Sequence, residues 1–174
     1  INLGIGSPDL PAHPDVIRTL QESASLPNAH AYQSYKGVLQ LRQAMSDWYR
    51  NWYNVSLNPD TDILPLLGSK EGIMHICMTY LNKGDEVLVP DPGYPTYSAA
   101  VKLAGGKPVT YKLKEKNHYE PDFERLEKKG LHKVKLMLVN YPHMPTGQAA
   151  SEQLFEKIVA FARRHPILVV HDNP

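Results

Sequence analysis

From residue 63 onward, the sequence alternates between patterns typical of β-strands and patterns typical of α-helices. Short apolar runs predict strands, and segments with apolar residues three and four positions apart predict helices. The predicted strands cover residues 63–67, 86–89, 109–113, 135–140 and 167–172. The predicted helices lie at residues 73–81, 95–103, 122–129 and 151–162, the last with Ser151 as its N-cap.

This alternation predicts an α/β fold of three layers, in which helices cover both faces of a mostly parallel sheet. Upstream, a polar, proline-bearing stretch up to about Ala31 precedes one amphipathic helix over residues 38–52. We therefore expect an N-terminal segment, residues 1–30, followed by a single α/β region over residues 31–174. Ligands of such folds bind at the carboxyl ends of the strands, so the loops that follow strands are the candidate sites.

The composition favours small-molecule chemistry over nucleic-acid or membrane binding. The formal net charge is +1, which gives no field of one sign to attract a polyanion or an anionic membrane. No apolar run reaches the roughly 18 residues of a membrane span, and the first residues lack the layout of a signal peptide. Cys77 lies in an apolar helical pattern and is expected to pack in the core. We expect a cytoplasmic protein without a metal site.

The loop at residues 67–72 joins a predicted strand to a predicted helix and suits a phosphate group. Gly68 lets the backbone approach a ligand closely, and the helix N-terminus offers unpaired N–H groups. Ser69 and Lys70 add a hydroxyl and a cation. The spacing is neither that of a P-loop nor GxGxxG, so it does not indicate a nucleoside triphosphate or a dinucleotide. An ordinary helix start with a solvated lysine is the alternative.

Further candidates also follow strands. The proline-rich loop at residues 90–97 holds Tyr94, which could stack on an aromatic cofactor or pack in the core. The loop at residues 140–147 ends in the turn signal PTG. Asp172 ends an apolar strand, where a carboxylate is costly to bury without a cationic partner such as a protonated ring nitrogen. Capping of the next turn is the alternative for Asp172.

Six motifs occur in order along the chain, namely GIGSPD, HAYQSYKG with LRQAM, LLGSKEGI, PDPGYPTY, NYPHMPTG and VVHDNP. In this order they resemble the motifs of class I and II aminotransferases, the fold-type I enzymes that use pyridoxal 5'-phosphate. Each motif alone is weak, but together they span essentially the whole chain. The GSKEG and DPGYPTY forms are most similar to the branch that contains LL-diaminopimelate aminotransferase and its aspartate- or alanine-type relatives.

The resemblance implies a role for each matching residue. Gly68, Ser69 and Lys70 would hold the cofactor phosphate. Tyr94 would stack on the pyridine ring, and Asp172 would pair with the ring nitrogen and keep it protonated. Residues 31–174 would then be the first part of the cofactor-binding large domain.

The resemblance also implies partners. Tyr32 matches a tyrosine that reaches the cofactor phosphate of the neighbouring subunit, which implies a homodimer with shared sites. Gly6 matches a glycine beside the substrate carboxylate, where a side chain would obstruct binding. The implied reaction is transamination between an amino acid and a 2-oxo acid.

The chain departs from the family at one cofactor contact. Met144 stands where the family usually has an asparagine whose amide contacts the ring hydroxyl, and a thioether cannot donate that hydrogen bond. His143 and Asn140 are the candidates to replace it.

The larger departure is at the end of the chain. The family's Schiff-base lysine, its arginine for the substrate carboxylate and the tyrosine that follows the HDNP turn have no counterpart after Asp172. We therefore expect an N-terminal fragment of a longer enzyme, with no catalytic residue in this chain, inactive and poorly soluble by itself.

Other functions fit parts of the pattern. A carbon–sulfur lyase of the same superfamily shares every motif, and would release products without an amino acceptor. A degenerate, non-catalytic module for association or regulation is favoured by Met144 and the missing lysine, and the sequence beyond Pro174 would distinguish it. A nucleotide-binding Rossmann domain is disfavoured, because the loop at residues 67–72 lacks the glycine fingerprint. The substrates are not specified by this sequence.

Overall fold

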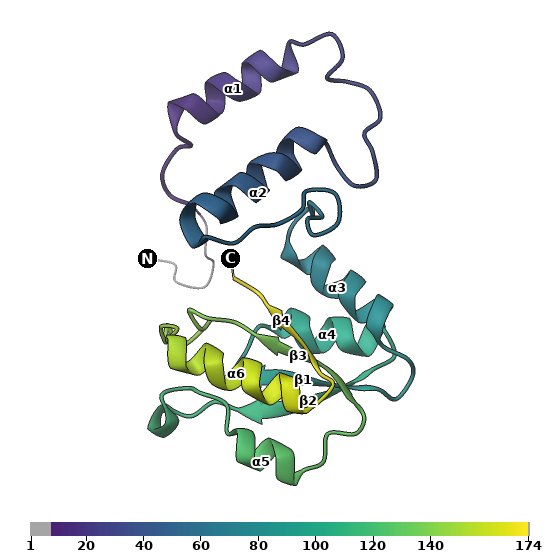
Figure 1. Ribbon diagram of the computed structural model, residues 1–174, viewed down its shortest axis with the longest axis vertical. Coiled ribbons are helices and arrows are strands. Elements are labelled where there is room, and N and C mark those ends of the chain that lie inside the picture. The colour runs from purple at the N-terminus through teal and green to yellow at the C-terminus, as the bar shows by residue number, and fades with distance from the viewer. Residues whose placement is uncertain (1–7, 174) are drawn as a thin grey trace. The chain divides into compact units, whose positions relative to one another are not determined.

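A computed structural model describes residues 8–173 of the chain (Figure 1). The chain divides into two compact units, Ile1–Pro65 and Leu66–Pro174, which are described separately. The first holds α1 (Pro14–Ala24) and α2 (Leu39–Tyr53). The second holds α3 (Ser69–Tyr80), β1 (Glu86–Asp91), α4 (Pro95–Leu103), β2 (Lys107–Lys112), the 3₁₀ turn η1 (Glu115–Asn117), α5 (Phe123–Lys128), β3 (Val134–Val139), α6 (Glu152–Arg164) and β4 (Leu168–His171).

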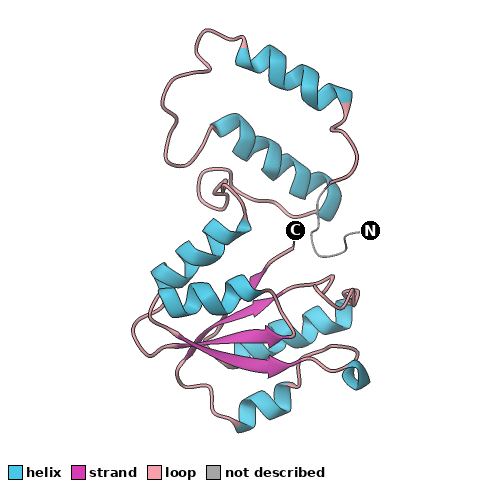
Figure 2. Ribbon diagram, turned by 180° about the vertical axis from the view of Figure 1, so that it is seen from behind, coloured by secondary structure: helices cyan, strands magenta, loops and turns pink. Residues whose placement is uncertain are grey.

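The second unit is built on a parallel sheet of four strands in the order β2-β1-β3-β4 (Figure 2). Each strand is followed or preceded by a helix, as parallel pairing requires. The predicted boundaries agree closely with the structure from Glu86 onward, and the helix at residues 95–103 matches α4 at both ends. The side chain of Ser151 accepts a hydrogen bond from the backbone N–H of Leu154 at 3.1 Å, which confirms Ser151 as the N-cap of α6.

Helices cover both faces of this sheet, and alternate residues of the central strands divide between them. One face packs with α3 and α4, and its buried strand residues are Val87, Val89, Leu136 and Leu138. The other face packs with α5 and α6, and its buried strand residues include Leu88, Met137 and Val139. The predicted three-layer α/β architecture is thus confirmed. Cys77 of α3 is fully buried in the first of these layers, as its apolar pattern predicted.

Two predictions about the first 67 residues are wrong. Residues 63–67 form no strand, because a strand needs a hydrogen-bonded neighbour and none of the four strands pairs with this segment. The stretch before Ala31 is not only a polar lead-in, since it contains α1. Its signals were Pro14 in the first helical turn and three apolar residues at helical spacing, which are Val16, Ile17 and Leu20.

The parallel strands bring the functional loops to one edge of the sheet. The loop after β1 begins at Pro92, the loop after β3 begins at Asn140, and Asp172 follows β4 directly. The backbone N–H of Asp172 donates to the carbonyl of Val139 at 2.9 Å, so Asp172 extends the pairing of β4 with β3. Among the helices of residues 8–173, none combines the length and apolarity needed to cross a membrane.

The position of α6 over the sheet gives a test of the packing. Ile158 is fully buried, whereas its neighbour Val159 is 44% exposed. Ile158→Ala should lower the free energy of unfolding by about 2–5 kcal/mol, because the removed methyl groups leave a cavity between helix and sheet. Val159→Ala should change it by less than about 0.5 kcal/mol. Urea unfolding followed by circular dichroism measures both, and equal effects would contradict the assigned face of α6.

Candidate functional site

Asp172 lies at the carboxyl edge of the sheet and is 8% exposed. Its carboxylate accepts a hydrogen bond from the hydroxyl of Tyr97, which reaches Oδ2 at 2.9 Å. Its backbone carbonyl accepts from the side-chain amide of Asn140 at 2.7 Å. Asp172 is therefore held from two elements, its carboxylate by α4 and its backbone carbonyl by the loop after β3.

Tyr97 is well suited to donate to this carboxylate. It is 1% exposed, and its position in the first turn of α4 directs it to the end of β4. Burial raises the pKa of Tyr97 strongly, and the hydrogen bond and negative charge of Asp172 raise it further. The hydroxyl consequently keeps its proton and remains a donor.

Asp172 has capacity for another partner. Within residues 8–173, no second donor to its carboxylate is present besides Tyr97. A nearly buried carboxylate that accepts one neutral hydrogen bond is incompletely compensated. A cation beside the free oxygen would compensate the burial of the carboxylate, and a protonated ring nitrogen has the charge and donor geometry for this position. The residues present thus fit the pyridinium end of pyridoxal phosphate.

Tyr94 links this carboxylate to a cationic group at the start of α3. Its ring meets the ring of Tyr97 edge-on, with centroids 5.7 Å apart. Nζ of Lys70 lies 5.9 Å from the Tyr94 ring centroid. The pKa of Tyr94 is lowered, first by the Thr96 side chain and then by Lys70. The series from Lys70 through Tyr94 and Tyr97 to Asp172 places a cation and a carboxylate at opposite ends of an aromatic surface.

The start of α3 has the features of an anion site. Gly68 is the N-cap with φ +108°, a conformation that favours glycine. No side chain caps this helix, and Ser69 and Lys70 are exposed in its first turn. Glu71 bonds to the N–H of Leu67 at 2.6 Å rather than to the first helical N–H groups. The N–H groups of the first turn and Lys70 therefore remain suited to a phosphate.

The loop at residues 140–147 is stabilised by its own contacts. Oδ1 of Asn140 accepts from the backbone N–H of Met144 at 2.7 Å, while its amide donates to Asp172. Asn140 therefore joins this loop to the end of β4 through both ends of its amide group, and its role as a substitute for the asparagine missing at position 144 stays a prediction. His143 is 2% exposed and bonds through Nδ1 to the hydroxyl of Thr146 at 2.7 Å. Met144 is 41% exposed.

The structure brings most of the predicted site residues together. Gly68, Ser69, Lys70, Tyr94 and Asp172 all belong to the second unit and lie along its sheet edge. Their roles toward a cofactor stay predictions.

The other predicted residues lie elsewhere, and one contributor was missed. Tyr32 belongs to the first unit and is fully exposed, whereas Gly6 lies outside the described residues. Sequence reasoning missed Tyr97. Its only signal was a polar aromatic residue three positions after Tyr94 in a predicted helix, which places both on one face.

The fold defines the chain as an α/β protein, with its candidate ligand site at the carboxyl ends of its strands. The sequence matches the family described as "Aminotransferase class I and II" over residues 1–173. It is 44% identical over 172 residues to LL-diaminopimelate aminotransferase from Halothermothrix orenii, covering 99% of this chain and 44% of that protein. It is 37% identical over 173 residues to the Aquifex aeolicus protein of the same name, covering 99% of this chain and 45% of that one.

Solved structures agree. BacF from Bacillus subtilis superposes with a TM-score of 0.95 at 40% identity, covering 99% of this chain and 44% of that one. An aminotransferase from Staphylococcus aureus gives a TM-score of 0.93 at 35% identity, covering 99% and 46%. The chain thus spans less than half the length of the relatives it matches. It belongs to the class I and II aminotransferases, whose members use pyridoxal phosphate.

The hydrogen bond from Tyr97 to Asp172 can be tested without a ligand. Tyr97→Phe should lower the free energy of unfolding by about 1–3 kcal/mol, because a charged acceptor loses its donor in a buried position. Tyr80→Phe is the matched control, since Tyr80 is 53% exposed, and it should have little effect. Denaturant unfolding of both variants measures the difference. An unchanged free energy of unfolding in the Tyr97→Phe variant would contradict the hydrogen bond.

His143 predicts a loss of stability in mild acid. Burial lowers the pKa of His143 from 6.5, and the backbone carbonyl of Pro92 opposes this only in part. The unfolded chain therefore binds a proton more readily than the folded one. The stability contributed by neutral His143 is complete above pH 6.5 and falls as the pH decreases toward the folded pKa.

The matching experiment compares unfolding free energies between about pH 5 and pH 7.5, the range in which histidine titrates. His143→Asn should reduce the change of the unfolding free energy with pH. His132→Asn, at an exposed position, should leave that change as large as in the wild type. Identical profiles for the wild type and His143→Asn would show that another group is responsible.

Proposed function

We propose that the protein containing this chain transfers an amino group between an amino acid and a 2-oxo acid with pyridoxal phosphate as cofactor. The observation that carries the proposal is the nearly buried carboxylate of Asp172, with one donor and capacity for a cation, at the edge that also presents Tyr94 and Lys70. Membership of the class I and II aminotransferases supports it.

Each of these groups has a defined task. The first turn of α3, with Gly68, Ser69 and Lys70, binds the phosphate. Tyr94 stacks on the ring, and Asp172 pairs with the ring nitrogen. Tyr97 occupies one oxygen of Asp172 and so orients the other toward the ring. When bound, the cofactor supplies an electron sink for the α-carbon of the substrate.

The proposal includes the partners and the location of the protein. Tyr32 of one subunit reaches the phosphate site of a second copy, so the protein is a homodimer, and Gly6 lies near the substrate carboxylate. Residues 1–30 are an N-terminal segment and residues 31–174 the first part of the large domain. The protein acts in the cytoplasm. Relatives named LL-diaminopimelate aminotransferase make LL-diaminopimelate the first amino donor to test.

The test uses the full-length parent protein with pyridoxal phosphate, a panel of amino donors and 2-oxo acid acceptors. Asp172→Asn should lower kcat/KM at least a hundredfold, equivalent to about 2.7 kcal/mol, because the carboxylate no longer keeps the ring nitrogen protonated. Asp47→Asn, at an ion pair on the surface of α2, is the control and should retain activity. Full activity of Asp172→Asn would reject the role, and turnover of a sulfur amino acid without an acceptor would identify a lyase.

A further inference from the structure

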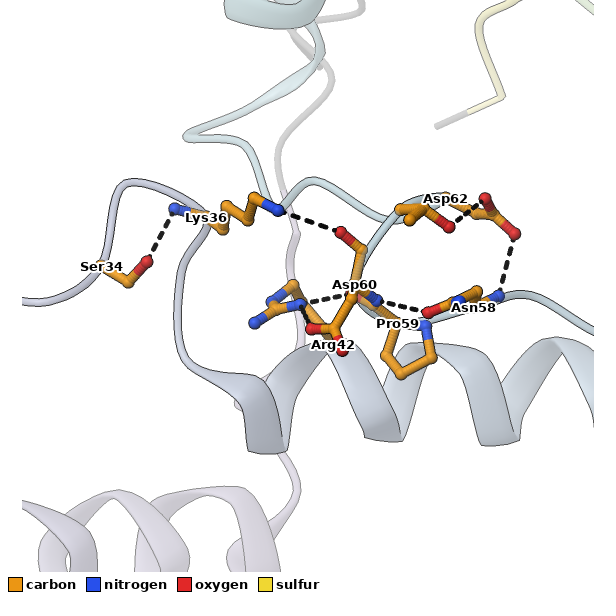
Figure 3. Close-up of polar contacts among 8 residues, drawn as sticks. Ser34, Lys36, Arg42, Asn58, Pro59, Asp60 and Asp62 are labelled. Carbon is orange, nitrogen blue, oxygen red and sulfur yellow. Dashed lines mark hydrogen bonds and ion pairs between the residues drawn. The ribbon is translucent and has the colours of Figure 1, made fainter.

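Arg42 ties α2 to the loop at residues 57–62 within the first unit (Figure 3). Its side chain is almost completely buried, at 6% exposure for the residue. One guanidinium nitrogen, Nη1, donates to the carbonyl of Pro59 at 2.5 Å and to Oδ1 of Asp60 at 2.7 Å. One turn further along α2, Ser46 donates to the carbonyl of Leu57 at 2.6 Å.

The loop at residues 57–62 is also stabilised by hydrogen bonds within it. Asn58 bonds through its side chain to the N–H of Asp60 at 2.9 Å, and its own N–H donates to the Asp62 carboxylate at 2.9 Å. The pKa of Asp62 is lowered, chiefly by this bond from Asn58. The loop thus has a defined shape when it meets Arg42, and it can transmit the position of α2 to a third segment.

That third segment is the turn at residues 34–37. Nζ of Lys36 donates to the carbonyl of Asp60 at 3.2 Å (Figure 3). The N–H of Gly37 donates to the carbonyl of Ser34 at 2.8 Å. Gly37 has φ +74°, and a Cβ there would lie 3.0 Å from Pro65. The turn is consequently held by its own hydrogen bond and by the Asp60 carbonyl, and Pro65 leaves no room for a side chain at Gly37.

Tyr35 lies in this fixed turn and Tyr32 lies two residues before it, and both side chains are fully exposed. Holding a donor in its bound position before the ligand arrives lowers the conformational entropy lost on binding. Stability alone does not explain why an arginine is buried at position 42, because Nε of Arg42 has no hydrogen-bond partner among the described residues. Burying an arginine so incompletely paired costs free energy that a well-packed apolar residue would not.

We propose that Arg42 is a positioning residue for the shared cofactor site, acting through Asp60 and Lys36 to hold Tyr32 where its hydroxyl meets the cofactor phosphate of a second copy of this chain. The inference rests on the proposed function, in which Tyr32 makes that contact. It assigns to Arg42 an effect on cofactor binding across the dimer, although Arg42 itself touches neither cofactor nor substrate.

The experiment measures the dissociation constant for pyridoxal phosphate in the full-length dimer, by cofactor absorbance after equilibrium dialysis. Arg42→Met should weaken binding about tenfold while sedimentation still shows a dimer. Arg50→Met is the matched control. Arg50 lies on the same helix and pairs with Asp47 at the surface, so its loss should leave cofactor affinity unchanged.

A double-mutant cycle separates positioning from general stability. In the Tyr32→Phe background, Arg42→Met should weaken binding less than twofold, because the contact that it orients is already absent. Full additivity of the two substitutions would overturn the proposal, as would unchanged affinity in Tyr32→Phe. Lys36→Met keeps the proposal testable if Arg42→Met fails to fold, since Lys36 is exposed, and it should show the same non-additivity with Tyr32→Phe.

The failure of this inference differs from failure of the proposed function. A parent protein that binds the cofactor and transaminates, but whose Arg42 and Tyr32 substitutions are additive, retains the function and loses only the positioning role. A parent protein that does not bind pyridoxal phosphate loses both.

Discussion

The hydrogen bond between Tyr97 and Asp172 joins two distant parts of the second unit. It connects residues 75 positions apart, one in the first turn of α4 and the other directly after the last strand. A buried carboxylate at this edge would be costly without it. Because Asn140 also holds the backbone of Asp172, the start of α4, the loop after β3 and the end of β4 are joined by hydrogen bonds at this edge.

Periodicity predicted most of the sheet and its helices, since the central strands β1 and β3 are buried between two helical layers and the helices that cover them turn an apolar face to the sheet. The prediction failed at residues 63–67, where an apolar run has the composition of a strand but no neighbour in the described chain. The local sequence pattern shows which secondary structure a segment prefers, whereas strand pairing requires a second strand from another part of the chain. The exposed α1 was missed because its few apolar residues stand among prolines and polar residues.

The site shows a similar division. Residues whose task depends on local geometry, such as Gly68 and Lys70 at a helix N-terminus, could be proposed from the sequence. Tyr97 could not, because its importance arises from a contact that only the folded sheet creates. The same holds for the two hydrogen bonds of Asn140, with the N–H of Met144 and the carbonyl of Asp172, since both arise only in the folded chain.

The strand order has a further consequence for this edge. From β1 the chain crosses through α4 on one face to β2, and from β3 it crosses through α6 on the opposite face to β4. The two connections diverge between adjacent strands β1 and β3, which makes this a topological switch point, the position at which open α/β sheets bind their ligands. The position of the candidate site is therefore a property of chain connectivity. Substitutions such as Met144 can alter which ligand groups are recognised there without moving the place where a ligand binds.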